Sequence, residues 1–428
     1  MKVKSTISMD DSGSTDTRMA TLNVTAKDRD VWVASALALA ALLAFYFSVK
    51  ATMQHFDYTS RIASAFIQGD LGLRTPAPSW LNEMVPADGR FYSAFPLGAV
   101  LSMLPVAVLQ KVKLIKDFPG RALAALIAAL SVWFLFRLSV VGIKSIPKRV
   151  VLSLVPIFGT WTWCNLGFGG AWQIALGLAV LGQVAALYFV LVEFRPLVAG
   201  AFFALAIGNR TELALCLPIF IYFVVRRIAP DAGDLKTLAQ QCRDKSSVFV
   251  YFLIVPVVLG LLTALYNYAR FHSIFDFGYS HIPKVLQERW YQHGLFSLHA
   301  IPWNIHKMLF EGFRDAPTFP FIRFYPFGCS IFLASPFLFL IFREGGDHKA
   351  VAWIAIGLLT SALWVHGNPG GWQFSYRYAM VLLPWMFLLL LGNGPPKISV
   401  IEGSLLVASV IINALATYQF LWTSQIHP

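Results

Sequence analysis

Residues 172–192 read WQIALGLAVLGQVAALYFVLV, a run without a single charged side chain. An α-helix rises about 1.5 Å per residue, so about 20 apolar residues cross the roughly 30 Å hydrocarbon core of a bilayer. Similar apolar runs recur along the chain, separated by short polar or basic segments. This pattern predicts a bundle of membrane-crossing helices.

The composition indicates an integral membrane protein. The chain has 428 residues, of which 57% are hydrophobic and 13% are charged, and its mean hydropathy is +0.63. An ordinary soluble domain carries about 25% charged residues. A soluble chain of this length would form two or three domains, whereas a helical bundle in lipid can be one continuous unit. We therefore expect a single transmembrane domain over residues 29–428.

The expected fold is all-α, with eleven or twelve membrane-spanning helices. Candidate helices lie near residues 31–51, 93–109, 121–137, 150–166, 172–192, 196–208, 211–225, 247–268, 326–342, 350–365, 378–392 and 399–421. Full crossings by both 93–109 and 121–137 would reverse the orientation of everything that follows. Pro96 and Pro105 weaken the first of these segments, and the second is short. We therefore expect one of the two to be re-entrant or tilted.

The basic residues predict the orientation, because Lys and Arg accumulate in the cytoplasmic loops of membrane proteins. They cluster at residues 137–149, 226–245 and 343–349 and at Lys397. These clusters place the N-terminus in the cytoplasm, with large outer loops at 52–92 and 269–325. Residues 1–28 are polar and are expected to form a disordered cytoplasmic tail. The net charge of +12 fits topology signals and contacts with membrane lipids, so no nucleic-acid partner is expected.

The first outer loop carries the leading catalytic candidate, Asp57. The run from His55 to Tyr58 leads into apolar positions with a 3.6-residue period that ends at Gly69. This pattern predicts an amphipathic helix on the membrane surface, with Asp57 at the boundary between lipid and water. A partly desolvated carboxylate there suits a general base, or a ligand for a divalent cation such as Mg²⁺ or Mn²⁺. The simpler alternative is that Asp57 only caps the helix.

Further motifs supply candidate residues for binding a donor or an acceptor. They are Asp88, Arg90, Tyr92, Arg210, Glu212, Arg377 and Tyr378. Asp88-Gly89 is equally typical of a plain turn. Charges at a membrane edge are costly unless paired or functional, so Arg210 and Glu212 either neutralise each other or bind a ligand. Arg377, between aromatic residues at a helix entrance, suits bidentate binding of phosphate; the alternative is a snorkelling Arg in an interfacial aromatic belt.

Taken in order, these motifs resemble the GT-C superfamily of membrane glycosyltransferases, which includes protein O-mannosyltransferases and the bacterial lipid A aminoarabinose transferase. The resemblance covers nearly the whole chain in short motifs. They are the Asp57-Tyr58 helix ending at Gly69, Asp88-Gly89-Arg90-Phe91-Tyr92 with Pro96, Arg210-Thr211-Glu212, Tyr266-Asn267-Tyr268-Ala269-Arg270-Phe271 with Phe277-Gly278-Tyr279, and Tyr376-Arg377-Tyr378 with Pro384.

The resemblance implies a polyprenyl-phosphate sugar as donor, with transfer on the non-cytoplasmic face. Carried over, Asp57 becomes the catalytic base or metal site and Arg377 holds the donor phosphate, with Arg210 as the alternative. Many members have a second acidic or histidine residue in the next outer loop, where this chain has Gly167-Phe168-Gly169-Gly170-Ala171-Trp172-Gln173. This departure leaves a dependence on metal open.

The resulting hypothesis is a glycosyltransferase of a bacterial inner membrane that moves a sugar to a lipid, glycan or protein acceptor. Two other classes fit the same pattern of helices. An O-antigen polymerase or ligase would use residues of the 269–325 loop, such as His281 and Arg289. A transporter or flippase for lipid-linked substrates would need charged groups deep in mid-helix, and the sequence has almost none there.

Overall fold

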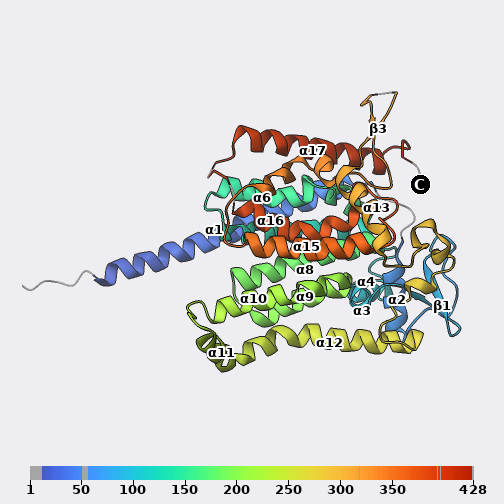
Figure 1. Ribbon diagram of the computed structural model, residues 1–428, viewed down its shortest axis with the longest axis horizontal. Coiled ribbons are helices and arrows are strands. Elements are labelled where there is room, and N and C mark those ends of the chain that lie inside the picture. The colour runs from blue at the N-terminus through green and yellow to red at the C-terminus, as the bar shows by residue number, and fades with distance from the viewer. Residues whose placement is uncertain (1–11, 51–55, 318, 393, 396, 427–428) are drawn as a thin grey trace, which may run out of the picture.

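The structure is a computed structural model that describes residues 12–50, 56–317, 319–392, 394–395 and 397–426. These residues are mostly helical, and the helices lie side by side in an elongated bundle (Figure 1). Five helices are long and apolar enough to cross a membrane. They are α1 (Ser12–Ser48), α5 (Gly120–Leu138), α8 (Ala171–Leu191), α12 (Ser246–Phe271) and α17 (Val400–Leu421).

Six further passes along the bundle are shorter or interrupted. They are α6 (Ile146–Phe158) with α7 (Thr162–Gly167), α9 (Pro196–Asn209), η2 (Thr211–Cys216) with α10 (Leu217–Ile228), α14 (Ile331–Ala334) with η8 (Pro336–Phe342), α15 (Lys349–Val365), and η9 (Arg377–Leu382) with α16 (Leu383–Leu391). The prediction of a single helix over 326–342 is therefore wrong, because the helical segment is interrupted at Ser335. Pro336 follows that break and has no N–H to continue the earlier helix.

Residues 93–109 do not form one crossing helix. They contain α3 (Leu97–Leu101) and most of α4 (Leu104–Lys111), with a break at Ser102 and Met103. The α4 helix packs against α2 (Tyr58–Ile67) at one end of the bundle (Figure 1). In contrast, α5 is continuous. Of the two doubtful segments, 93–109 is thus the one that is broken into two short helices, whereas 121–137 lies within one continuous helix.

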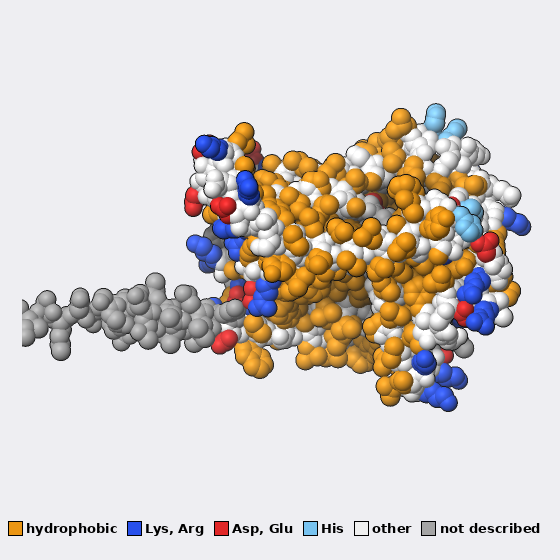
Figure 2. Space-filling model, turned by 90° about the horizontal axis from the view of Figure 1, so that it is seen from below, with side chains coloured by type: hydrophobic (Ala, Val, Ile, Leu, Met, Phe, Trp, Pro, Cys, Tyr) orange, Lys and Arg blue, Asp and Glu red, His pale blue; other side chains and the backbone are white. Residues whose placement is uncertain are grey.

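The two ends of the bundle carry different elements. One end, here called the inner end, holds α11 (Leu235–Asp244), and the opposite outer end holds α2, α3 and α4 (Figure 1). The basic segments meet acids at the inner end, where Lys148 and Arg343 both pair with Glu402 at 3.4 and 2.7 Å. On the face shown in Figure 2, hydrophobic side chains cover the middle, and charged and histidine side chains gather toward the ends.

Small non-helical elements interrupt the expected all-helical fold at the outer end. Two antiparallel hairpins pair β1 (Met84–Ala87) with β2 (Arg90–Ser93) and β3 (Arg314–Asp315) with β4 (Ile322–Arg323). The remaining short elements are η1 (Ser139–Val141), η3 (Tyr279–His281), η4 (Val285–Gln287), η5 (Arg289–Tyr291), η6 (Leu298–Ala300), α13 (Ile301–Ile305) and the π-helical η7 (His306–Phe310). The α1 helix begins at Ser12, within the expected tail; residues 1–11 lie outside the described residues.

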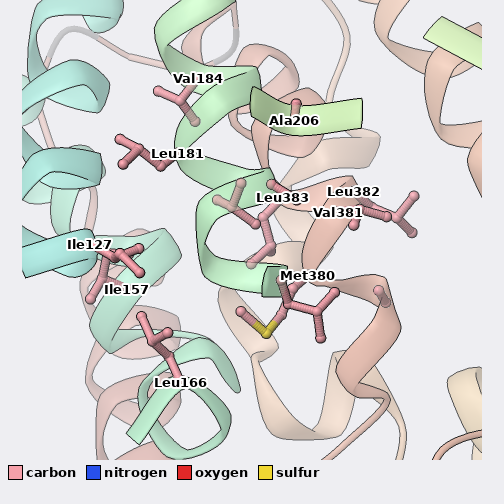
Figure 3. Close-up of a cluster of buried hydrophobic side chains, with 14 of the residues drawn as sticks. Ile127, Ile157, Leu166, Leu181, Val184, Ala206, Met380, Val381, Leu382 and Leu383 are labelled. Atoms are coloured by element: carbon pink, nitrogen blue, oxygen red, sulfur yellow. The ribbon is translucent and has the colours of Figure 1, made fainter. Parts of the chain in front are cut away.

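The core is built around α8. Figure 3 shows Leu181 and Val184 of this helix among buried side chains of α5, α6 and η9. The one amide in the middle of α8, Gln183, is buried, accepts a hydrogen bond from Trp385 Nε1 at 2.9 Å and donates one to the Val381 carbonyl. Its polar atoms are therefore satisfied within the bundle, as burial in an apolar core requires.

Candidate functional site

A pocket of about 790 Å³ opens at the outer end of the bundle. Its lining residues come from segments that are distant in sequence, and the part of the lining used below consists of Phe95, Trp172, Arg210, Glu212, Leu215, Phe275, Asp276, Tyr279, Phe296, Leu363, His366 and Tyr378. The walls are mainly apolar and aromatic, with a few charged groups among them. This combination is typical of a site that binds a ligand with a polar head and an apolar body.

Arg210 and Glu212 lie at the break between α9 and η2 and form an ion pair of 2.7 Å between Nε and Oε1. Both side chains line the pocket. The pairing predicted as the alternative to ligand binding is therefore present. However, the guanidinium of Arg210 also lies over the ring of Tyr378, 4.9 Å from its centroid, and Tyr378 lines the pocket as well.

Arg377 is a second cation beside Tyr378, and it lies outside the lining of the pocket. It begins η9, is only 8% exposed, and lies 5.1 Å from the centroid of the same Tyr378 ring. Its Nη2 contacts the Tyr378 hydroxyl at 3.4 Å, while its Nε is buried without a hydrogen-bond partner. No ion pair to Arg377 occurs among the described residues. Burying a cation without a paired anion costs free energy.

His366 lies where α15 ends and brings an imidazole to the pocket. Its Nδ1 lies 2.8 Å from the carbonyl of Asn368, an acceptor, so Nδ1 carries the proton and Nε2 is left as an acceptor. The ring packs edge-on against Tyr378 and Phe296, with centroids 5.8 and 5.6 Å apart. Burial, aided by the nearby positive charge of Arg210, lowers the pKa of His366. The imidazole is therefore neutral at neutral pH.

A half-buried acid, Glu83, lies next to the aromatic wall of the pocket. It accepts a hydrogen bond of 2.5 Å from Nε1 of Trp172, whose ring packs at a tilt against Phe95 with centroids 4.2 Å apart. Burial raises the pKa of Glu83, and the positive charge of Arg377 works against that rise. Glu83 therefore lies in the electrostatic field of Arg377.

Asp57 lies in a different cavity. It precedes α2 at the N-cap position but makes no capping hydrogen bond, and instead its Oδ1 accepts from Arg61 Nε at 2.8 Å. The two side chains line a smaller cavity of about 380 Å³ with Lys116 and Asp117. The neighbouring Tyr58 stacks toward Phe95, which lines the larger pocket. Asp57 thus lies outside the lining of the larger pocket, and its catalytic role stays a prediction; His55 lies outside the described residues.

Asp88, Arg90 and Tyr92 belong to the β1–β2 hairpin and do not line the larger pocket. Asp88 has a φ of +47° in the two-residue turn and contacts His272 at 3.1 Å. Arg90 pairs with Asp70 at 2.8 Å, and Tyr92 is buried against Phe271. The contacts of these three side chains are those of a hairpin that holds the outer loops together, which is the plain turn that Asp-Gly also predicted.

The described residues contain no group of three or more His, Cys, Asp or Glu side chains that could hold a metal ion. The four cysteines are free, and Cys164, Cys216 and Cys329 are buried.

In the long outer loop, His281 pairs with Asp276 at 2.7 Å and stacks on Phe271. Arg289 lies over the rings of Trp290 and Trp303.

The sequence analysis did not single out two side chains that shape this site, His366 and Trp172. His366 stands between an apolar helix and the turn-forming sequence Gly367-Asn368-Pro369-Gly370-Gly371. A histidine at the point where such a helix ends was the available signal, because ionisable residues at membrane boundaries are seldom incidental.

The comparisons with known proteins give no name to this arrangement. No protein-family model, no curated protein and no solved structure matches the chain. The function is therefore argued from the geometry of the pocket.

Proposed function

We propose that the protein is an integral membrane glycosyltransferase that moves a sugar from a polyprenyl-phosphate donor to an acceptor at the outer end of the bundle. The observation that carries this proposal is the pair of guanidinium groups, Arg377 and Arg210, that lie 5.1 and 4.9 Å from the centroid of the Tyr378 ring, which lines the pocket. Only Arg210 has an ion-pair partner among the described residues. A phosphate beside Arg377 supplies the missing negative charge, and a guanidinium binds phosphate in a bidentate fashion.

The proposed orientation places the N-terminus in the cytoplasm. The inner end, with its basic segments and α11, then lies on the cytoplasmic side, as the distribution of Lys and Arg favours. The pocket opens on the other side, where a lipid-linked donor presents its head group. The apolar residues Leu215 and Leu363 in the wall suit the isoprenoid next to that phosphate.

In the proposed reaction, an oxygen or nitrogen of the acceptor attacks the anomeric carbon of the donor sugar. The bond between that carbon and the phosphate oxygen breaks, and polyprenyl phosphate leaves with its charge stabilised by Arg377 and Arg210. Fixed positive groups in a site of low dielectric stabilise such developing charge strongly. The acceptor proton passes to a base in the pocket.

Two side chains compete for the role of that base. His366 lines the pocket, is neutral, and has Nε2 as a proton acceptor. Asp57 is favoured by the resemblance to GT-C enzymes, but it is paired with Arg61 in the smaller cavity. We favour His366, because a general base must come within hydrogen-bond reach of the proton that it removes.

The test measures transfer from a labelled polyprenyl-phosphate sugar by purified His366→Gln, Asp57→Asn and His281→Gln variants. We expect His366→Gln to lower kcat by about 10²–10⁴ with little change in donor affinity, the usual effect of losing a general base. Loss of activity in Asp57→Asn alone would move the base to the smaller cavity. Loss in His281→Gln alone would favour a polymerase or ligase that uses the long loop. Full activity in all three variants would refute the proposed chemistry.

A further inference from the structure

The β3–β4 hairpin exposes an unusual amount of apolar surface. Phe319 and Phe321 at its tip are 82% and 63% exposed, and Ile322 follows at 37%. In Figure 1 this hairpin stands out sideways from the bundle, next to the outer end of α17. An exposed loop in water is ordinarily polar, so the apolar tip indicates contact with an apolar partner.

Hydrogen bonds to α17 set the position of the hairpin along the bundle. Nε2 of Gln419 donates to the carbonyl of Ile322 at 2.8 Å, and Oε1 of the same side chain accepts from the N–H of Phe324 at 3.2 Å. Gln419 lies two residues before the end of α17 at Leu421, which is about 3 Å along a helix axis. The half-exposed Trp422 follows directly. The base of the hairpin is therefore level with the outer end of a helix long enough to span a bilayer.

The charges at the hairpin base fit the same level. Arg314 and Arg323 pair through their backbones across the base, and both are exposed. At the edge of a bilayer, cationic side chains meet lipid phosphates, while aromatic side chains enter the boundary with the acyl chains. The hairpin presents both kinds of side chain in that order, with cations at its base and phenylalanines at its tip.

We propose that the tip of this hairpin, Phe319 to Ile322, inserts into the outer leaflet of the membrane, with Arg314 and Arg323 at the lipid phosphates. The occupant of this apolar surface is lipid, and the hairpin fixes the outer end of α17 at the bilayer boundary. The proposal rests on the proposed orientation in the membrane. It does not depend on glycosyl transfer.

The experiment uses the full chain with Cys242→Ser, because the other three cysteines are buried. Phe319→Cys is labelled with a small fluorophore and reconstituted into phosphatidylethanolamine–phosphatidylglycerol vesicles. Quenching is measured with lipids carrying a nitroxide near the head group and with aqueous iodide. Gln287→Cys, an exposed polar position in the outer loop, is the water-facing control. Val407→Cys, 57% exposed in the middle of α17, is the lipid-facing control.

We expect lipid quenching at position 319 to exceed that at position 287 by at least threefold, and iodide quenching to be at least threefold lower. Equal iodide quenching at positions 319 and 287 would overturn the hairpin proposal, provided that the label at 407 is quenched by lipid. If the label at 407 is not quenched either, the membrane placement of the bundle fails as a whole. A label at 319 that is shielded only in native membranes would show that a protein is the occupant, which also overturns the proposal.

Discussion

Replacing Arg377 by Gln separates a ligand-binding cation from a structural one. The Arg377 guanidinium is buried and its Nε lacks a hydrogen-bond partner. Among the described residues, its side chain makes one hydrogen bond, the long one to the Tyr378 hydroxyl, and it lies over the ring of the same residue. Removing it therefore breaks little within the protein. It also removes the cost of burying an unpaired charge, so the free energy of unfolding of the ligand-free protein should stay constant or increase.

The expected loss in donor binding follows from the interactions that the guanidinium can make. A hydrogen bond to a charged group contributes about 1.5–3 kcal/mol. One such bond at the upper end of this range, or two at the lower end, amount to about 3 kcal/mol. Each 1.4 kcal/mol is a factor of about ten in affinity. We expect the Kd for polyprenyl phosphate to increase about 30-fold to several hundred-fold. Arg210 remains in the variant and retains part of the affinity.

The assay measures binding of polyprenyl phosphate and of uncharged polyprenol to detergent-solubilised protein, together with thermal unfolding. Arg270→Gln is the matched control. Arg270 is fully buried and contacts the rings of Tyr266 and Phe271, which do not line the pocket, whereas Arg377 contacts Tyr378, which does. It donates to the Ser93 carbonyl and to Asn267 Oδ1 at 2.8 and 2.6 Å. Loss of these bonds should lower the free energy of unfolding by about 2–4 kcal/mol and leave the intrinsic donor affinity unchanged.

The reasoning is refuted if Arg377→Gln destabilises the protein as much as Arg270→Gln while the Kd for polyprenyl phosphate stays constant. Arg377 would then be a structural residue, and the pocket would lose the feature that identifies its ligand as a phosphate. Equal binding of polyprenol and polyprenyl phosphate by the unmodified protein leads to the same conclusion.

Two further predictions concern the base and the packing of the helices. The pKa of His366 lies below its ordinary value of 6.5, so the transfer rate should not depend on this group above pH 6.5 and should fall in acid as Nε2 becomes protonated. A pH–rate profile checks this. If the fall in acid persists in His366→Gln, another group is responsible for it. A methyl group on Gly98 would collide with the backbone of Gly208, whereas Gly260 has open space around its Cα. Gly98→Ala should therefore lower the free energy of unfolding by about 1–3 kcal/mol, and Gly260→Ala should not; similar melting temperatures for both would contradict the close α3–α9 contact.

The long helices were predictable because composition alone defines them. The expected helix at 172–192 corresponds to α8 at Ala171–Leu191, and the one at 121–137 corresponds to α5 at Gly120–Leu138. The interrupted segments were not predictable to the same degree. A break such as that at Ser102 is decided by packing, because α4 leaves the bundle direction to lie against α2.

The site was predictable in part for the same physical reason. Arg210, Glu212 and Tyr378 were found because charged and aromatic residues at the ends of apolar runs are conspicuous in a sequence. That these three side chains lie close together could not be predicted, because it depends on how the end of α9 and η9 are placed next to each other in the bundle. His366 joins them because α15, which ends just before it, packs against η2 and η9, and no local pattern encodes that packing.

The most direct test of the central claim follows one labelled polyprenyl-phosphate sugar in vesicles that contain the purified protein and a mixture of lipid, glycan and peptide acceptors. Mass spectrometry of the products should show free polyprenyl phosphate and an acceptor that carries the sugar, with both lost in Arg377→Gln. If the donor stays chemically intact, or only moves intact between leaflets, the protein is not a glycosyltransferase and the pocket serves transport or binding instead.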